Sequence, residues 1–84
     1  MHRLEITRLA RKQIDALPKS VASRVESAIV ELADNPRPAG SLKMKDRKDT
    51  WRIRVGRYRV VYEIHDEVLV VIIVRVAHRR DVYR

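Results

Sequence analysis

Alternating apolar and polar residues on both sides of a Gly-Arg pair constrain the fold more than any other feature of this chain. The apolar positions are Trp51, Ile53 and Val55 before Gly56-Arg57, and Tyr58, Val60 and Tyr62 after it. A two-residue loop with glycine at its first central position is typical of a β-hairpin, and strict alternation is typical of strands buried on one face. The stretch from Thr50 to Ile64 therefore predicts two antiparallel strands over an apolar core.

The predicted turn also fixes which residues of the hairpin lie opposite each other. On the apolar face, counting from the turn pairs Val55 with Tyr58, Ile53 with Val60 and Trp51 with Tyr62. On the other face, Arg54 lies directly across from Arg59, and Arg52 lies beside Val61. Like charges opposite each other destabilise a strand pair. We interpret the paired arginines as a face that is prepared to bind an anion.

Two helices are predicted before the hairpin. Thr7 suits the N-cap of the first helix, whose apolar residues recur at helical spacing until Pro18 ends the run. Ser20 is expected to cap a second helix, which ends at Asn35-Pro36. Its apolar stripe consists of Val21, Val25, Ala28, Ile29, Leu32 and Ala33.

Further segments complete the predicted sheet. Leu4 and Ile6 favour a short first strand, and residues 41–49 form a loop or an edge strand. His65-Asp66-Glu67 is a predicted turn, and the apolar run Val68 to Val76 is typical of a central strand covered on both faces. The order β-α-α-β-β-β predicts one α+β domain over residues 1–84, with two N-terminal helices packed on one face of a mostly antiparallel sheet.

Positive charge is concentrated in the β-rich half of the chain. The 84 residues carry a formal net charge of +8. Residues 1–35 have six basic and five acidic side chains, whereas residues 41–60 have eight and two, and residues 75–84 have four and one. A phosphate backbone binds such a surface because each neutralised phosphate releases counterions. The distribution therefore favours a polyanionic partner on the free face of the sheet.

Composition excludes several classes of protein. There is no cysteine, so disulfides, thiolate chemistry and a cysteine-type zinc site are excluded. The longest apolar run, Val68 to Val74, is too short to span a bilayer, and the N-terminus lacks an apolar export signal. We expect a cytosolic protein that does not enter a membrane.

Three stretches in order carry a resemblance to a known family. They are LPKSVASRVESAIVELADNPRP from Leu17, WRIRVGRYRVVYEI from Trp51, and the terminal HRRDVYR. Together they resemble the RelE/ParE superfamily of bacterial and archaeal toxins, and specifically its RelE-type mRNA interferases. The resemblance implies a small toxin that cleaves mRNA in the A site of the 70S ribosome. It also implies that a cognate antitoxin, encoded beside the toxin, holds it inactive.

The resemblance assigns the catalytic positions to Arg52, Arg54, Arg59, Arg79 and Tyr83, while His78 occupies a position that varies in the family. The implied reaction is attack by a ribose 2′-hydroxyl on the adjacent phosphate, with no metal and no cofactor. The products are a 2′,3′-cyclic phosphate and a free 5′-hydroxyl. Guanidinium groups suit this step because they bind phosphate oxygens through two hydrogen bonds and neutralise the charge of the phosphorane.

One feature departs from the best-known pattern of the family, which has lysines in place of Arg52 and Arg54. Lysine can be tuned by burial to act as a base, whereas arginine stays protonated. Histidine titrates near neutral pH, so His78 or Tyr83 is the candidate for proton transfer. His78 can equally be a structural or surface histidine. Tyr83 can instead stack on an mRNA base or pack the C-terminal segment.

Other basic residues are expected to bind RNA phosphates without reading sequence. They are Lys43, Lys45, Arg47, Lys48, Arg57 and Arg80. Two other functions remain open: a ParE-like toxin that inhibits DNA gyrase through protein contact, and a non-enzymatic RNA-binding module. The expected antitoxin is acidic and partly disordered, and it covers either the basic face or the helices in a hetero-oligomer.

Overall fold

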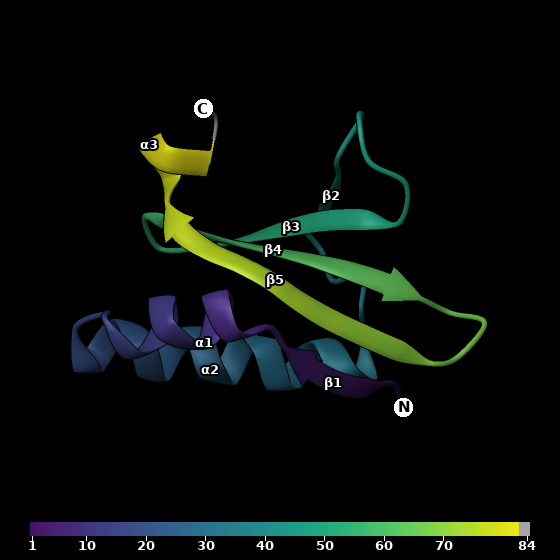
Figure 1. The fold of residues 1–84 in the computed structure, drawn as a ribbon, viewed down its shortest axis with the longest axis horizontal. Coiled ribbons are helices and arrows are strands. Elements are labelled where there is room, and N and C mark those ends of the chain that lie inside the picture. The colour runs from purple at the N-terminus through teal and green to yellow at the C-terminus, as the bar shows by residue number, and fades with distance from the viewer. Residues whose placement is uncertain (83–84) are drawn as a thin grey trace.

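A five-stranded sheet carries two helices on one face and leaves much of the other face open (Figure 1). The structure is a computed structural model that describes residues 1–82. The strands are β1 (Arg3–Ile6), β2 (Leu42–Lys43), β3 (Thr50–Val55), β4 (Tyr58–His65) and β5 (Val70–His78), and the helices are α1 (Arg8–Asp15), α2 (Lys19–Asp34) and α3 (Arg79–Val82). This arrangement confirms the predicted α+β class.

The order of strands in the sheet is β1-β5-β4-β3-β2. β1 runs parallel to β5, and the other neighbouring pairs are antiparallel. β2 lies at one edge, so the edge-strand alternative for residues 41–49 is correct at Leu42–Lys43. α3 is a short additional element at the C-terminal end of β5 that was not predicted.

The β3–β4 hairpin has the predicted register. Trp51 pairs with Tyr62, and Arg54 pairs with Arg59 across the ladder. Gly56 has a φ of 59°, a left-handed conformation that glycine adopts without the steric penalty of a Cβ. The glycine therefore sets the turn, and the turn sets the two faces of the hairpin.

The helices begin at different kinds of cap. Thr7 caps α1 as predicted, and its Oγ1 accepts a hydrogen bond from the Ala10 N–H over 3.1 Å. The predicted Ser20 cap is wrong, because α2 already begins at Lys19 with Pro18 in the N-cap position. Pro18 has a φ of −55°, which its ring fixes near this value. Its geometry starts the helix without a side-chain hydrogen bond.

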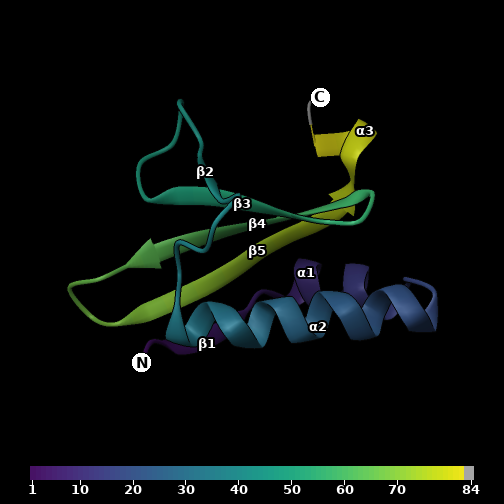
Figure 2. The ribbon, with the colours of Figure 1, turned by 180° about the vertical axis from the view of Figure 1, so that it is seen from behind.

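The core lies between the sheet and the helices, with α2 running along the length of the sheet (Figure 2). It also contains the Tyr62 ring, whose hydroxyl donates a hydrogen bond to the Pro36 carbonyl over 2.7 Å. Trp51 packs against this core, as predicted, and lies beneath the Arg37 guanidinium. The buried aliphatic residues are Ala10, Ile14, Val25, Ile29, Leu32, Ile53, Val60, Ile64, Val71, Ile73 and Val76.

β5 differs from the predicted apolar strand in two ways. It begins at Val70 rather than Val68, because Val68 and Leu69 lie in the β4–β5 turn, where their side chains are exposed. The register against β4 also shifts between Val61 and Tyr62, which leaves Val74 as an extra residue. Such a bulge changes the face on which the following side chains lie.

None of the helices within residues 1–82 is long and apolar enough to cross a membrane.

Candidate active site

The open face of the sheet carries two rows of arginine side chains near its hairpin end. In one row Arg54 of β3 lies opposite Arg59 of β4, which in turn pairs with Ala77 of β5. In the next row Arg52 and Arg75 lie on either side of Val61. The rows place the guanidinium-bearing residues of three neighbouring strands on one surface.

Arg59 is the most enclosed of these cations. The residue is 5% exposed, and among the residues whose burial is described it is the only charged one that is buried. Arg54 is exposed and Arg52 is half-buried. A buried cation in a setting of low dielectric constant interacts strongly with an anion that reaches it. Arg59 is therefore the strongest candidate for contact with a phosphate group.

A hollow of about 710 Å³ brings the hairpin turn together with the C-terminal segment. The backbone N–H of Arg79 donates a hydrogen bond to the Arg57 carbonyl over 2.8 Å, which ties α3 to the β3–β4 turn. The lining residues are Arg57, Arg59, His78, Arg79 and Arg80. Five residues predicted from the sequence thus share one hollow.

A second hollow of about 240 Å³ lies on the other side of Arg59. Arg52 and Arg54 line it together with Gly40, Leu42 and Ile53. Arg59 lines both hollows and so lies where they meet. Four of the proposed catalytic arginines, Arg52, Arg54, Arg59 and Arg79, are therefore gathered around one place.

His78 lies at the junction of β5 and α3. Its ring meets the Tyr58 ring edge-on, with centroids 5.4 Å apart and an interplanar angle of 78°. Its Nδ1 atom accepts a hydrogen bond from the backbone N–H of Arg80 over 3.4 Å. The remaining predicted catalytic residue, Tyr83, lies outside the described residues.

The expected RNA anchors divide between two places. Arg57 and Arg80 line the larger hollow beside Arg59. The anchors of β2 and the following loop, Lys43, Lys45 and Arg47, line a separate hollow of about 530 Å³ that reaches Arg52. Lys48 is exposed in the same loop but does not line that hollow.

Arg75 is a member of this surface that the sequence did not reveal. In a regular strand Arg75 would share a face with the buried Val71 and Ile73. The bulge at Val74 instead puts Arg75 opposite Val61, on the open face, and puts Val76 in the core. A single charged residue in an otherwise apolar strand is the signal that indicates such a change of face.

The family described as "ParE toxin of type II toxin-antitoxin system, parDE" matches residues 4–83. The chain is 37% identical over 82 residues to Toxin RelG of Mycobacterium tuberculosis, covering 96% of this chain and 94% of the relative. The chain therefore belongs to the RelE/ParE superfamily of type II toxins.

Solved structures show that the fold of this RelE/ParE toxin is shared. The RelE–RelB complex from the archaeon Pyrococcus horikoshii OT3 contains a chain that matches with a TM-score of 0.83 and 26% identity, covering 93% of this toxin and 94% of that chain. The toxin-antitoxin complex RelBE2 from M. tuberculosis matches with a TM-score of 0.81 and 29% identity, covering 93% and 98%.

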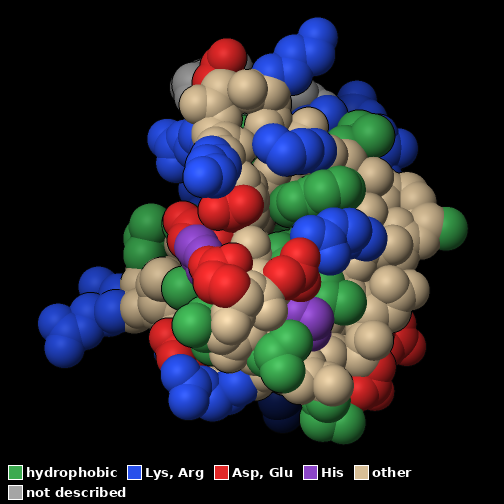
Figure 3. All heavy atoms as spheres, turned by 90° about the vertical axis from the view of Figure 1, so that its right-hand side faces the viewer, with side chains coloured by type: hydrophobic (Ala, Val, Ile, Leu, Met, Phe, Trp, Pro, Cys, Tyr) green, Lys and Arg blue, Asp and Glu red, His purple; other side chains and the backbone are tan. Residues whose placement is uncertain are grey.

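Acidic side chains gather at the end of the toxin that carries the β4–β5 turn, and Lys and Arg side chains surround them (Figure 3). Asp66 accepts from His2 over 2.9 Å and from Arg37 over 2.8 Å, and both hydrogen bonds lower the pKa of its carboxyl group. His65 contacts Glu63 over 2.9 Å, and this hydrogen bond raises the pKa of the imidazole. The β3–β4 turn end of the sheet is thus cationic, whereas at the other end these carboxylates lie beside the basic β2–β3 loop, whose Asp49 carbonyl accepts from the Ile64 N–H over 2.9 Å.

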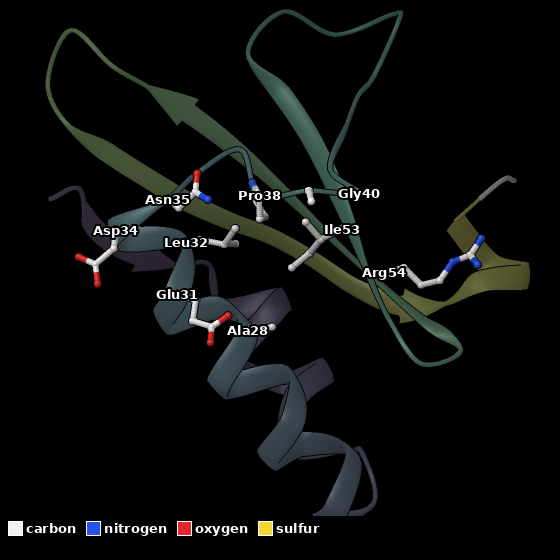
Figure 4. A pocket seen from close by; sticks show the side chains of 10 residues that line it. Ala28, Glu31, Leu32, Asp34, Asn35, Pro38, Gly40, Ile53 and Arg54 are labelled. Carbon is white, nitrogen blue, oxygen red and sulfur yellow. The ribbon is translucent and has the colours of Figure 1, made fainter.

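A further hollow of about 420 Å³ lies between the C-terminal half of α2 and β3 (Figure 4). Glu31 and Asp34 line its helix side, and Gly40, Ile53 and Arg54 also line the second hollow of the cationic site. Two carboxylates repel a phosphate, so this hollow is a poor site for a ligand that carries phosphate groups. In the part of the chain that is described, no group of His, Asp and Glu side chains could hold a metal ion.

Proposed function

We propose that this RelE-family toxin is a ribosome-dependent endoribonuclease that cleaves mRNA in the A site of the 70S ribosome and so inhibits translation. The observation that carries the proposal is the position of Arg59, a buried cation that lines two hollows and has further arginines on both sides. A phosphodiester is the substrate group that uses such an arrangement, because its charge increases when a nucleophile attacks it.

The proposed reaction is an internal transfer that needs no metal and no cofactor. The 2′-hydroxyl oxygen of one ribose attacks the phosphorus of the adjacent phosphodiester and loses its proton. The bond from phosphorus to the 5′-oxygen of the next nucleotide then breaks, and that oxygen takes up a proton. The products are a 2′,3′-cyclic phosphate and a free 5′-hydroxyl, which together contain all the atoms of the substrate.

The arginines stabilise the charge that develops in this reaction. Arg59 would hold the non-bridging oxygens of the phosphate from the floor of the site. Arg54 and Arg79 would approach from the two hollows that Arg59 adjoins. Planar guanidinium groups suit this task because each can donate two parallel hydrogen bonds to phosphate oxygens.

Proton transfer cannot be assigned to the arginines of this site. Arg52 and Arg54 remain protonated and so do not act as a general base. The two other groups assigned to the site are His78 and Tyr83. We propose that Tyr83 contributes either to proton transfer or to stacking on a base, since a tyrosine hydroxyl can donate and accept a hydrogen bond.

The remaining cations are proposed to hold the substrate and the ribosome. The β2–β3 loop rises above the open face at some distance from α3 (Figure 1). Four of these cations lie in β2 and this loop: Lys43, Lys45, Arg47 and Lys48. Contacts of these side chains with phosphates would raise affinity without choosing a sequence. Arg57 and Arg80 would do the same beside the scissile phosphate.

The partner is proposed to be an acidic antitoxin that is encoded beside the toxin. The similar chain from M. tuberculosis RelBE2 was solved in a toxin-antitoxin complex, and the similar P. horikoshii chain was solved in a RelE–RelB complex. An acidic segment lying on the open face would neutralise the arginine rows and occupy both hollows. We propose that the toxin and antitoxin form a hetero-oligomer in the cytosol.

One finding favours a second candidate function. The family that matches residues 4–83 is described by the name ParE, and a ParE-like toxin would inhibit DNA gyrase through protein contact without cleaving RNA. The gathered arginines support the ribonuclease, because protein contact does not need a buried cation between two hollows.

The deciding experiment combines 70S ribosomes programmed with mRNA and a parallel gyrase supercoiling assay. We expect A-site cleavage by the toxin and no inhibition of gyrase. Arg59→Ala should abolish cleavage, with circular dichroism checking that it is folded, while Arg8→Ala on the exposed surface of α1 serves as the control. Gyrase inhibition without cleavage would establish the second candidate, and full cleavage by Arg59→Ala would refute the site.

A further inference from the structure

We propose that His78 is a positioning residue that caps α3 and so holds Arg79 in the cleavage site, and that it does not transfer a proton. This inference rests on the proposed ribonuclease function, because it concerns the same site. The observation behind it is the hydrogen bond from the Arg80 N–H to Nδ1 of His78.

The direction of that hydrogen bond decides where the proton of the imidazole lies. A backbone amide can only donate, so Nδ1 must offer its lone pair to Arg80. In the neutral ring the proton is then on Nε2, and neither nitrogen has a free lone pair. His78 would have to release Arg80 before it could take a proton from a 2′-hydroxyl, so the bond that is observed opposes a role as general base.

The same hydrogen bond satisfies the start of a helix that is only one turn long. The first N–H groups of any helix lack partners within it. In α3 the Arg79 N–H donates to the Arg57 carbonyl, and the Arg80 N–H donates to His78. Both amides are therefore tied to the structure that precedes α3, and the direction in which the Arg79 side chain leaves the backbone is fixed by these two bonds.

Tyr58 holds the imidazole in the orientation that the cap requires. Tyr58 and His78 are paired across β4 and β5, and their rings meet edge-on. This arrangement is a favourable one for aromatic rings. The tyrosine thus fixes the ring of His78 from one side, while the hydrogen bond to Arg80 fixes it from the other.

Two substitutions of His78 distinguish the role of Nδ1 from that of Nε2. The side-chain oxygen of asparagine lies at the position of Nδ1, so His78→Asn keeps an acceptor for Arg80, and asparagine is a preferred N-cap. Glutamine places its polar atoms nearer Nε2, so His78→Gln keeps a polar group at the outer end of the side chain and loses the cap. His78→Ala loses both.

The first test measures single-turnover cleavage of mRNA on the ribosome. We expect His78→Asn to cleave at nearly the wild-type rate, and both His78→Gln and His78→Ala to lose roughly 2- to 30-fold, which corresponds to the loss of an N-cap. His65→Asn, at the end of β4 away from the site, is the control and should cleave like the wild type. A loss of about 10²-fold or more in all three His78 variants is what proton transfer predicts, and it would overturn the inference.

The second test does not depend on activity. Hydrogen exchange of the Arg80 amide, followed by NMR in the isolated toxin, should be slow in the wild type and His78→Asn, and faster in His78→Gln and His78→Ala. Equal exchange in wild type and His78→Ala would refute the cap. A wild-type toxin that fails to cleave mRNA while the exchange follows this pattern would refute the proposed function and leave the cap established.

Discussion

The side-chain oxygen of Gln13 accepts a hydrogen bond from the backbone N–H of Val76 over 2.7 Å, two residues beyond the extra residue of β5. At the extra residue itself, the Thr7 hydroxyl donates to the Val74 carbonyl over 3.0 Å. The bulge removes backbone groups at Val74 from the regular ladder, while Val76, which pairs with Val60, lies beyond Ile73, the last residue of β5 that pairs with β1. Side chains at the start and within α1 satisfy these groups, so a helix on the covered face helps to place Arg75 on the open face.

Replacing Gln13 should therefore weaken both stability and cleavage. Gln13→Ala leaves the N–H of the buried Val76 without this acceptor, and we expect the free energy of unfolding to fall by about 1–3 kcal/mol. Cleavage should also decrease, since Arg75 follows the bulge. Urea denaturation and ribosome cleavage assays measure the two effects. Lys12→Ala, on the exposed side of α1, is the control, and an equal effect of both changes would contradict the role of Gln13.

Removing one of the paired arginines should stabilise the toxin while impairing it. Arg54 and Arg59 lie directly opposite each other, and relief of this repulsion by Arg54→Gln should raise the free energy of unfolding by roughly 0.2–1 kcal/mol. Inorganic phosphate should stabilise the wild type more than the variant. Thermal denaturation with and without phosphate tests this, with Arg8→Gln as a change of equal charge. A less stable Arg54→Gln would show that the pair is not repulsive.

The buried hydroxyl of Tyr62 should be visible in both stability and titration. Tyr62→Phe removes the hydrogen bond to Pro36 and should cost about 1 kcal/mol. Burial raises the pKa of Tyr62 to about 12, so the folded state favours the neutral phenol. Its contribution to stability is therefore full below about pH 10, the ordinary tyrosine value, and is lost as the pH rises toward 12. Tyrosinate absorbance in wild type and variant measures the shift, and identical titrations would contradict it.

His65 should make stability depend on pH in the neutral range. Its hydrogen bond with Glu63, together with the charges of Glu63 and Glu67, raises the pKa of the imidazole above its ordinary value of about 6.5. The folded state then binds the His65 proton more tightly than the unfolded state does. The resulting stabilisation of the fold is full below the ordinary histidine pKa and is lost as the pH rises through the raised pKa of the folded state. Urea denaturation from pH 5 to 9, a range of about four units around that value, should show a steeper fall in wild type than in His65→Gln. Parallel curves would refute the prediction.

Cations of the β2–β3 loop should contribute to RNA affinity through salt-dependent contacts. The double variant Lys45→Gln/Arg47→Gln should reduce the slope of log K against log salt by about 0.7–0.9 for each phosphate contact that is lost. Filter binding to ribosomes over a range of salt concentrations measures the slope. Arg8→Gln/Lys19→Gln changes the net charge equally on the helical layer, and a similar reduction there would show that only total charge matters.

Much of the hairpin could be predicted because local rules determine it. Gly56 fixes a two-residue turn, and the turn fixes that Arg54 meets Arg59. The Thr7 cap follows in the same way from a hydroxyl that reaches the amide three residues later. In both cases the determining contacts lie within a few residues of each other in the chain.

The parts that could not be predicted depend on contacts between distant segments. The carbonyl of Val74 in the β5 bulge accepts from Thr7, and the nearby Val76 N–H donates to Gln13, which is 63 residues away in the chain. The placement of α3 depends on the Arg57 carbonyl and on the Nδ1 atom of His78. The resemblance to the family named Arg52, Arg59 and Arg79, but it did not indicate that one hollow joins the hairpin turn to the C-terminal segment.

The separation of charge along the sheet also has a consequence for encounters in solution. One end of the molecule carries the arginine rows, whereas at the other end the carboxylates of Glu63, Asp66 and Glu67 lie among basic side chains and offset their charge. Such a molecule has an electric dipole moment, and the field of a large polyanion exerts a torque on it. Rotation would bring the hairpin end forward before any contact is made, so that a larger fraction of collisions would begin in a productive orientation.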